Sequence, residues 1–323
     1  MEIDEAIIRD AMQKGRLIAH SEEIDYSCFR EKFRHVPRGT VIIGADGTAG
    51  AERTIPGFQR IKRIFTLEKG LAKNMASEFF WAEEKIDGFN LRVASIGGKL
   101  FAFSRGGFVD AFATEKVREM GLEPFFSKLP KYVLCGEMIG NTPYTKPTKK
   151  FDIKLFVFDI MDENGACVPQ EKKYSLIRQF GLPSVPVFGK FSRMKKADMK
   201  KLKKAFLSVN KSGKEGIVMK SEDRKEIMKY VVPNADIEDI ANSSHLLFDM
   251  PVGFINQRLL RSSLFMKDFK LDNKKYAFAL GKAFYDELSR GLESIEKDGY
   301  VCDEYEILIK DMKIWDLHCN KTP

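Results

Sequence analysis

The chain has 323 residues, of which 44% are hydrophobic and 11% aromatic, so it can bury a sizeable core and is longer than one average domain. It carries 54 Lys and Arg against 46 Asp and Glu, a formal net charge of +8 spread along the chain, which favours a polyanionic partner such as nucleic acid. The cysteines are scattered without a CxxC pair, the histidines lack metal-ligand spacing, and no apolar run approaches about 20 residues. These observations exclude a zinc site, a disulfide scaffold and a membrane span. We therefore expect a cytoplasmic protein with reduced thiols.

The first stretch, residues 1–68, begins with a helical pattern and then becomes strand-like. Apolar residues recur roughly once per turn at Ile7, Ile8, Met12, Leu17 and Ile18. Residues 40–43 and 60–65 read as strands around a loop rich in Gly and Pro. Because this loop lacks a GK[ST] signature, it predicts turns and not a phosphate-binding loop.

The middle stretch, residues 69–233, alternates β-rich runs with turn residues and is the candidate catalytic domain. The runs are residues 79–82, 91–94, 100–103 and 155–158. A basic run over residues 193–204 could follow an RNA backbone, since each neutralised phosphate releases counterions. A solvated lysine-rich helix explains the same run equally well.

The tail, residues 234–323, reads as helical. Apolar residues recur every four positions from Tyr276 to Leu292, Asp272 or Asn273 can cap the helix, and Gly299 can end it. A second helix is expected around Ile307, Leu308, Met312 and Trp315. The sequence thus predicts an α+β protein of three domains, at residues 1–68, 69–233 and 234–323.

One short run draws attention to chemistry: Glu83-Glu84-Lys85-Ile86-Asp87-Gly88-Phe89-Asn90. Lys85 ends a predicted strand just before an Asp87-Gly88 turn, so rigid backbone can project its amine into a groove between sheets. An ordinary hairpin with a solvated lysine is the alternative. A lysine nucleophile at neutral pH also needs cations, desolvation or a metal nearby, since an amine ordinarily has a pKa of about 10.4.

Four further motifs follow in order, at residues 104–107 (SRGG), 136–140 (GEMIG), 156–159 (FVFD) and 214–220 (KEGIVMK). Over residues 60–233 the ordered set resembles the covalent nucleotidyltransferase superfamily of ATP-dependent ligases and RNA capping enzymes. The length, the N-terminal module and the helical tail look most like the archaeal homodimeric ATP-dependent RNA ligases. The resemblance implies a ligase-type (ATP-grasp-like) catalytic domain of antiparallel sheets, an N-terminal α+β module and a helical C-terminal dimerisation domain.

The same resemblance implies a reaction. Lys85 attacks the α-phosphate of ATP, releases pyrophosphate and becomes a lysyl-AMP. The AMP then moves to an RNA 5′-phosphate, and a 3′-hydroxyl displaces it, joining or circularising single-stranded RNA. Phosphoryl transfer leaves the remaining residues to position groups and stabilise charge, with Mg²⁺ or Mn²⁺ as the metal.

Residue by residue, the resemblance assigns five nucleotide contacts, and the first three have a plainer alternative. Glu83 would recognise the adenine amine, or pair with a nearby lysine. Asn90 would contact ribose or phosphate, or be a turn-proximal strand residue. Arg105 can fork onto a phosphate or hydroxyl, or lie on the surface. Glu137 would hold the ribose hydroxyls or help a metal. Phe158 would stack on adenine, whereas Phe156, on the same strand face, has core packing as a rival role.

The last motifs supply the metal and the positive charge. Glu215 is the metal-ligand candidate, and Lys220 can neutralise phosphate. Lys229 resembles the final motif, but Tyr230-Val231 follows it where a KxK form is usual, so the division of roles between Lys220 and Lys229 stays open.

Two other classes of function remain. A GTP-using capping guanylyltransferase or a DNA ligase would share these motifs, although both usually append a β-rich OB domain where this tail is helical. A noncatalytic RNA-binding dimer is the second class, and its signature, loss of the lysine or the metal carboxylate, is absent here. The biological RNA substrate and the oligomeric state are not encoded in any of these motifs.

Overall fold

The computed structural model describes residues 3–44, 53–143, 151–243, 251 and 253–301. Its contacts divide the chain into two compact units. Of the described residues, unit 1 comprises those within 3–60 and 88–184, and unit 2 comprises those within 61–87 and 185–301. The division into three domains by chain order stays a prediction.

Unit 1 begins with helix α1 (Glu5–Gln13), capped by the Asp4 carboxylate, which accepts from the backbone N–H of Ala6. The helix was expected to include Leu17 and Ile18, and this was wrong. A turn ends it, and Leu17 begins a strand from which it packs against the apolar face of α1. The strand belongs to an antiparallel sheet of order β1-β2-β3-β4, formed by Leu17–Ser21, Asp25–Phe29, Val41–Ile43 and Arg53–Ile55.

The second sheet of unit 1 is antiparallel, with the order β10-β9-β7-β8, and has a hydrophobic cluster on each face. Leu91 and Met138 face one cluster, with apolar side chains of the helices. Ala94 and Cys135 face the other, with apolar side chains of the N-terminal sheet. The elements are β7 (Phe89–Ile96), β8 (Lys99–Ser104), β9 (Val133–Gly140), β10 (Ile153–Met161), α3 (Ala111–Arg118), α4 (Glu123–Lys128) and α5 (Gln170–Phe180).

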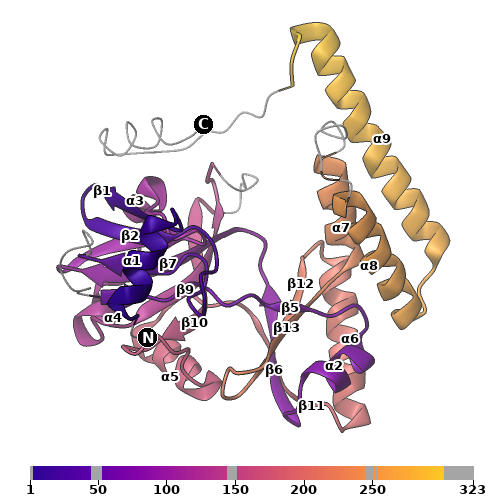
Figure 1. The fold of residues 1–323 in the computed structure, drawn as a ribbon. Helices are drawn as coiled ribbons and strands as arrows, with labels where there is room; N and C mark the ends of the chain where they lie inside the picture. Colours follow the sequence, from indigo (N-terminus) through magenta and orange to yellow (C-terminus); the bar gives the residue numbers. More distant parts are fainter. Residues whose placement is uncertain (1–2, 45–52, 144–150, 244–250, 252, 302–323) are drawn as a thin grey trace. The chain divides into compact units, whose positions relative to one another are not determined.

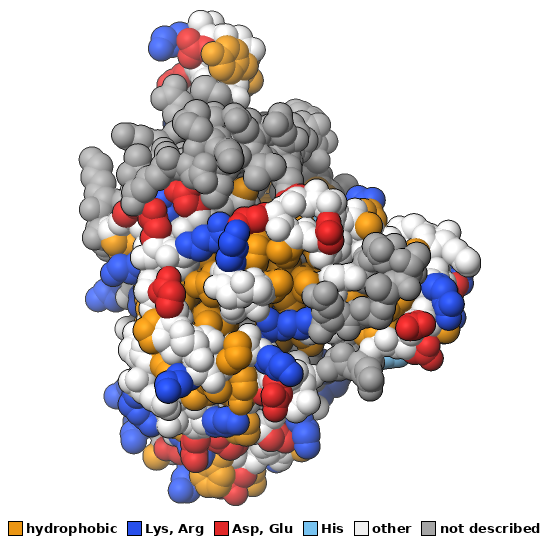
Figure 2. Space-filling view, turned by 90° about the vertical axis from the view of Figure 1, so that its left-hand side faces the viewer, with side chains coloured by type: hydrophobic (Ala, Val, Ile, Leu, Met, Phe, Trp, Pro, Cys, Tyr) orange, Lys and Arg blue, Asp and Glu red, His pale blue; other side chains and the backbone are white. Residues whose placement is uncertain are grey.

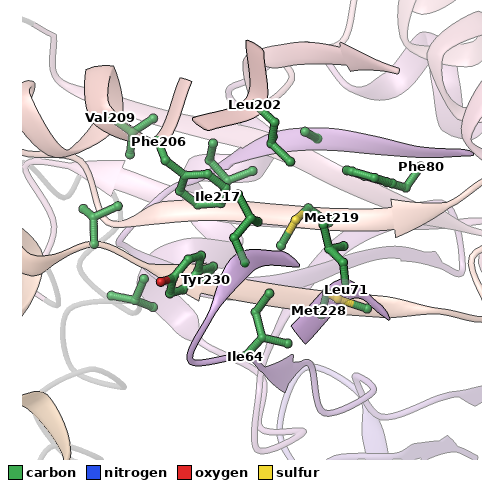
Figure 3. Close-up of a cluster of buried hydrophobic side chains, with 14 of the residues drawn as sticks. Ile64, Leu71, Phe80, Leu202, Phe206, Val209, Ile217, Met219, Met228 and Tyr230 are labelled. Carbon is green, nitrogen blue, oxygen red and sulfur yellow. The ribbon is translucent and has the colours of Figure 1, made fainter. Parts of the chain in front are cut away.

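Unit 2 is built on a five-stranded sheet of order β11-β6-β12-β13-β5, antiparallel except for the β13–β5 pair. One face carries apolar side chains that pack against helices α2 and α6, and Figure 3 shows Leu202 and Phe206 of α6 over Ile217 and Met219 of β12. The elements are β5 (Lys62–Arg63), α2 (Leu67–Asn74), β6 (Phe79–Lys85), β11 (Val187–Ser192), α6 (Lys196–Lys211), β12 (Gly216–Ser221) and β13 (Ile227–Val231).

The remaining part of unit 2 is helical. Helices α7 (Pro233–Asn242), α8 (Gly253–Phe269) and α9 (Asn273–Asp298) pack together (Figure 1). The predicted helix ends of α9 are confirmed: Asp272 caps the N-terminus, and Gly299 ends the helix with a φ of +82°. The second expected helix, around Ile307 to Trp315, lies outside the described residues.

The α+β class with antiparallel sheets and C-terminal helices is confirmed. Within the described part of the chain, no helix is long and apolar enough to span a membrane. On the face seen in Figure 2, basic and acidic side chains are interspersed around a central group of hydrophobic ones, so this face shows no segregated basic patch.

Candidate active site

Successive side chains of β6 point to opposite faces of the unit 2 sheet, which separates core residues from candidate site residues. Phe80 and Ala82 lie in the hydrophobic core, so Trp81, Glu83 and Lys85 point to the opposite face of the sheet. The strand ends at Lys85, as predicted. The hairpin alternative is wrong, because β6 pairs with β11 and β12 whereas β7 pairs with β8 and β9.

The Lys85 ammonium forms an ion pair with the Glu215 carboxylate, and the two side chains are only 18% and 16% exposed. Glu215 immediately precedes β12, whose first residue, Gly216, lies opposite Lys85 in the sheet. Burial raises the pKa of Glu215 above its usual range, and the Asp87 carboxylate adds to the rise while Lys85 opposes it. A carboxylate with a raised pKa is a stronger base, and this one touches the amine of the candidate nucleophile.

Lys220 and Glu83 form a second ion pair on the same face. Their Nζ and Oε2 atoms are 2.7 Å apart, and the side chains are 2% and 1% exposed. Glu83 thus has a lysine partner, as its plainer alternative supposed, although the pair is buried and not solvated. Its role in adenine recognition stays a prediction. The pair is neutral overall, so the positive charge of Lys220 reaches this face together with the negative charge of Glu83.

Lys229 lies near Arg63 and Glu215. It pairs in register with Arg63 of β5, and both cations interact electrostatically with the Glu215 carboxylate. Val231, where a KxK form would have its second lysine, is buried and apolar. Arg63 supplies a cation on this face instead. The sequence analysis did not identify Arg63 as a site residue. A signal was present, because Ile64 packs in the core and successive side chains of a strand point to opposite faces, so Arg63 points away from the core.

The donor set of this face fits a divalent ion that takes most of its ligands from a substrate. Among the described residues no group of three His, Cys, Asp or Glu side chains gathers to hold a metal. Asp87 and Glu215 do lie close together, near enough for the Asp87 carboxylate to raise the pKa of Glu215. Mg²⁺ commonly uses one or two carboxylates and completes its shell with phosphate oxygens and water, so two carboxylates are sufficient.

The other predicted site residues belong to unit 1. Asn90 lies opposite Glu137 in the β7–β9 pair, and its amide donates to the Glu137 carboxylate at 3.3 Å. Phe156 lies opposite Glu137 on β10 and is half-buried, outside the hydrophobic clusters. Phe158 sits at a bulge in β10 and packs edge-to-face on Phe58, with ring centroids 5.1 Å apart. Core packing therefore applies to Phe158, which packs against the cluster shared with the N-terminal sheet, and not to Phe156.

Arg105 is exposed in the turn that follows β8. Ser104, the last residue of β8, pairs with Leu91, which is next to Asn90 on β7. The turn is therefore at the same end of the sheet as the Asn90–Glu137 contact. The structure thus places Asn90, Glu137 and Phe158 on one sheet with Arg105 in the adjoining turn, and Glu83, Lys85, Glu215, Lys220 and Lys229 together in unit 2.

Comparison with known proteins fits this arrangement. Residues 78–231 match the family model described as RNA ligase. A putative ATP-dependent DNA ligase from Aquifex aeolicus is 30% identical, with a TM-score of 0.90 over 98% of this chain and 87% of that one. An archaeal ATP-dependent RNA ligase, at 24% identity, has the same fold, with a TM-score of 0.88 over 98% and 86% of the two chains. The uncharacterized protein MJ0414 of Methanocaldococcus jannaschii is 26% identical over 307 residues, covering 91% of this chain and 76% of its own length.

A lysine at the end of a sheet strand, paired with a carboxylate and surrounded by further cations, is the arrangement of an ATP-dependent nucleotidyltransferase. Within that class, the chain belongs to the RNA ligase family.

Proposed function

We propose that this protein is an ATP-dependent RNA ligase that joins a 5′-phosphate to a 3′-hydroxyl, within one strand or between two, through Lys85 bound to AMP. The observation that carries the proposal is the contact between Lys85 and Glu215, in a face that also holds Lys220, Lys229 and Arg63. A triphosphate needs such positive charge, and a lysine nucleophile needs a base beside it.

The first step uses this contact directly. The Glu215 carboxylate takes a proton from the Lys85 ammonium, and the freed lone pair of Nζ attacks the α-phosphorus of ATP. The P–N bond forms while the bond from that phosphorus to the bridging oxygen breaks, and pyrophosphate leaves with the electron pair. Lys229 and Arg63 neutralise charge on the phosphates, and the buried Lys220 holds its charge in place through Glu83.

Two transfers complete the reaction. A 5′-phosphate oxygen of RNA forms a bond to the phosphorus of lysyl-AMP as the P–N bond breaks, and the Lys85 nitrogen leaves with the electron pair and takes up a proton, giving an adenylated RNA end. A 3′-hydroxyl oxygen then loses its proton to water and forms a bond to the RNA 5′-phosphorus. The bond from that phosphorus to the bridging oxygen breaks, and AMP leaves with the electron pair. Asp87 and Glu215 would hold a Mg²⁺ or Mn²⁺ ion, which supplies charge neutralisation at the phosphate oxygens. Asn90, Arg105, Glu137 and Phe158 are assigned to the nucleotide, with Glu137 also a candidate metal ligand.

The test is a mass measurement after incubation with ATP and Mg²⁺. The wild-type protein should gain the mass of one AMP, and Lys85→Ala should gain none. Lys214→Ala is the matched control, because Lys214 is ion-paired to a carboxylate of the same sheet, Glu84, but is exposed. Preferential gain of GMP from GTP would replace the ligase with a capping-type enzyme. No adduct with either nucleotide, over a range of metals and pH, would leave a noncatalytic RNA-binding protein.

The acceptor needs its own comparison, because one relative is described as a DNA ligase. The adenylated protein should seal a 5′-phosphorylated RNA strand faster than the DNA strand of the same sequence. Equal or faster sealing of a nicked DNA duplex would assign the DNA ligase reaction instead.

We also propose that the protein is a homodimer through α9. The helix exposes Phe278, Tyr285 and Leu292 at intervals of seven residues, with exposed fractions of 74%, 69% and 54%. Seven residues are close to two helical turns, so the three side chains form one apolar stripe of the kind that pairs helices. Light scattering should give twice the mass of the chain, and Phe278→Ser with Tyr285→Ser should give the mass of one chain.

A further inference from the structure

Arg92, on β7, is a wholly buried arginine without an acidic partner among the described residues. It has 0% exposure, and its guanidinium donates to two backbone carbonyls, Pro56 O at 2.7 Å and Ser104 O at 2.9 Å. Burial lowers its pKa to about 10, so it remains charged at neutral pH. Its Nε atom is buried without a hydrogen-bond partner in the described part of the chain. A buried charge satisfied only by carbonyls is costly. Through these two carbonyls, Arg92 joins the Pro56 segment to the end of β8.

The two carbonyls belong to segments that meet again through a second path. The Gly57 N–H donates to the Thr40 hydroxyl at 2.9 Å. In the same loop, Gly39 lies against the turn after β8 so closely that a Cβ on it would be 2.2 Å from Arg105 O. A Cβ on Gly107 would be 2.9 Å from Gly39 O. Both glycines have a positive φ, so the contact needs two residues without side chains.

These contacts link the segments into a closed ring that includes the turn carrying Arg105. The ring runs from Arg92 to Ser104, through the turn to Gly39 and Thr40, and back through Gly57 and Pro56 to Arg92. The turn is closed by hydrogen bonds between Ser104 and Phe108, and its tip carries the exposed Arg105 side chain. The loop at residues 37–40 and the Pro56-Gly57 segment come from the N-terminal part of unit 1.

We infer that Arg92 is a positioning residue for Arg105, and that the N-terminal sheet serves the reaction by buttressing the turn that presents the Arg105 guanidinium. The inference rests on the proposed function, in which Arg105 contacts a phosphate or a terminal hydroxyl. A guanidinium gains most from a bidentate contact when its backbone is already fixed, because less conformational entropy is lost on binding.

Arg53 provides a matched control within the same unit. It lies on β4 and donates to the carbonyls of Ser95, Lys131 and Tyr132 at 2.6, 2.7 and 3.2 Å. Like Arg92, it joins the N-terminal sheet to the β7–β9 pair through carbonyls, but Ser95 lies near the end of β7 away from Asn90. Arg53→Met should cost stability and leave the Arg105 turn in place.

The first experiment is limited trypsin digestion of the whole chain, with the rate of cleavage after Arg105 followed by mass spectrometry. Cleavage under these conditions reports how often the turn opens locally. Arg92→Met should raise this rate at least about fivefold, Arg92→Lys should raise it less, and Arg53→Met should leave it unchanged. Equal rates in Arg92→Met and Arg53→Met would overturn the inference. This readout does not use activity, so it is separate from failure of the ligase proposal.

The second experiment is a pair of double-mutant cycles on formation of the Lys85–AMP adduct. Adding Arg105→Ala to Arg92→Met should lower the rate by no more than about twofold, whereas adding it to Arg53→Met should lower it by the full Arg105→Ala factor. Losses that multiply in both cycles, or an Arg105→Ala variant with full activity in adduct formation and in sealing, would overturn the inference. If Arg92→Met does not fold, Gly39→Ala displaces the same turn through the Arg105 carbonyl and takes its place in both experiments.

Discussion

The two units carry their site residues in different electrostatic conditions. In unit 2 the polar groups are charged and paired with one another: Lys85 with Glu215, and Lys220 with Glu83. In unit 1 the contact between Asn90 and Glu137 has one charged partner, and Arg105 is exposed on a turn fixed by backbone contacts. The unit 2 residues are held by ion pairs, and the unit 1 residues by a hydrogen bond, ring packing and backbone contacts.

The difference suggests which changes each unit tolerates. A phosphate that enters the unit 2 face must compete with Glu215 for Lys85. Lys85 therefore has to exchange one anionic partner for another, and the reaction depends on the charges of both Lys85 and Glu215. The side chains of unit 1 are held by weaker contacts, and their effect depends on position. Removing a charge should therefore have large effects in unit 2, and removing a hydrogen bond should have small effects in unit 1.

The largest expected effect is on catalysis by Glu215→Gln. Glutamine cannot take the proton of Lys85, so formation of the AMP adduct should slow by about 10²–10⁴-fold, the usual range for loss of a general base. Single-turnover kinetics at saturating ATP would measure it.

Glu84→Gln is the control for this substitution, because Glu84 is next to Lys85 on β6 and is ion-paired with Lys214. It should change the rate less than about threefold. Recovery of Glu215→Gln by a tenfold rise in Mg²⁺ would contradict proton transfer and assign Glu215 to the metal alone.

An effect of similar size, on stability, is expected from Lys220→Met. This substitution leaves Glu83 as a buried charge without its ion-pair partner and should lower the free energy of unfolding by about 3–5 kcal/mol. Glu83→Met with Lys220→Met should recover most of that loss, since an apolar pair fills the same space. Urea unfolding followed by circular dichroism would measure both. A double variant as unstable as the single one would show that the pair is not the source of the loss.

Much of this chemistry could be predicted because it depends on short, local patterns. The strand ending at Lys85, the cap at Asp272 and the end of α9 at Gly299 follow from neighbouring residues, and the structure confirms them. The order of the motifs predicted the family for the same reason. The partner exchange available to Lys85 could not be predicted, because Glu215 reaches it through strand pairing across 130 residues.

The errors and omissions have the same origin in long-range contacts. Leu17 has helical spacing after Met12, but packing against α1 favours a strand there. Arg63 gains its place because β5 adds to the sheet beside β13, in parallel with it. Arg92 lies among strand residues that read as ordinary core, and its two carbonyl partners are 36 and 12 residues away.

In unit 1, Asn90→Ala tests the opposite side of the comparison. It removes the hydrogen bond to Glu137 and should cost about 1 kcal/mol of nucleotide binding, seen as a rise in the KM for ATP of about fivefold with kcat almost unchanged. Steady-state kinetics of pyrophosphate release in the presence of acceptor RNA would measure it. A fall in kcat as large as that of Glu215→Gln would remove the distinction between the two units.

The last expected effect is a pH dependence of stability that belongs to Glu215. Because burial raises its pKa in the folded chain above the ordinary value of 4.5, the folded chain binds more protons than the unfolded chain between 4.5 and the raised pKa. Wild-type stability relative to Glu215→Gln should therefore fall as the pH rises through that window, by at most about 1.4 kcal/mol per pH unit, and should be constant at higher pH. Urea unfolding at a series of pH values would measure the difference. A relative stability that rises with pH over the same window would mean that the ion pair with Lys85 outweighs burial, and that the carboxylate is too weak a base to take the proton of the nucleophile.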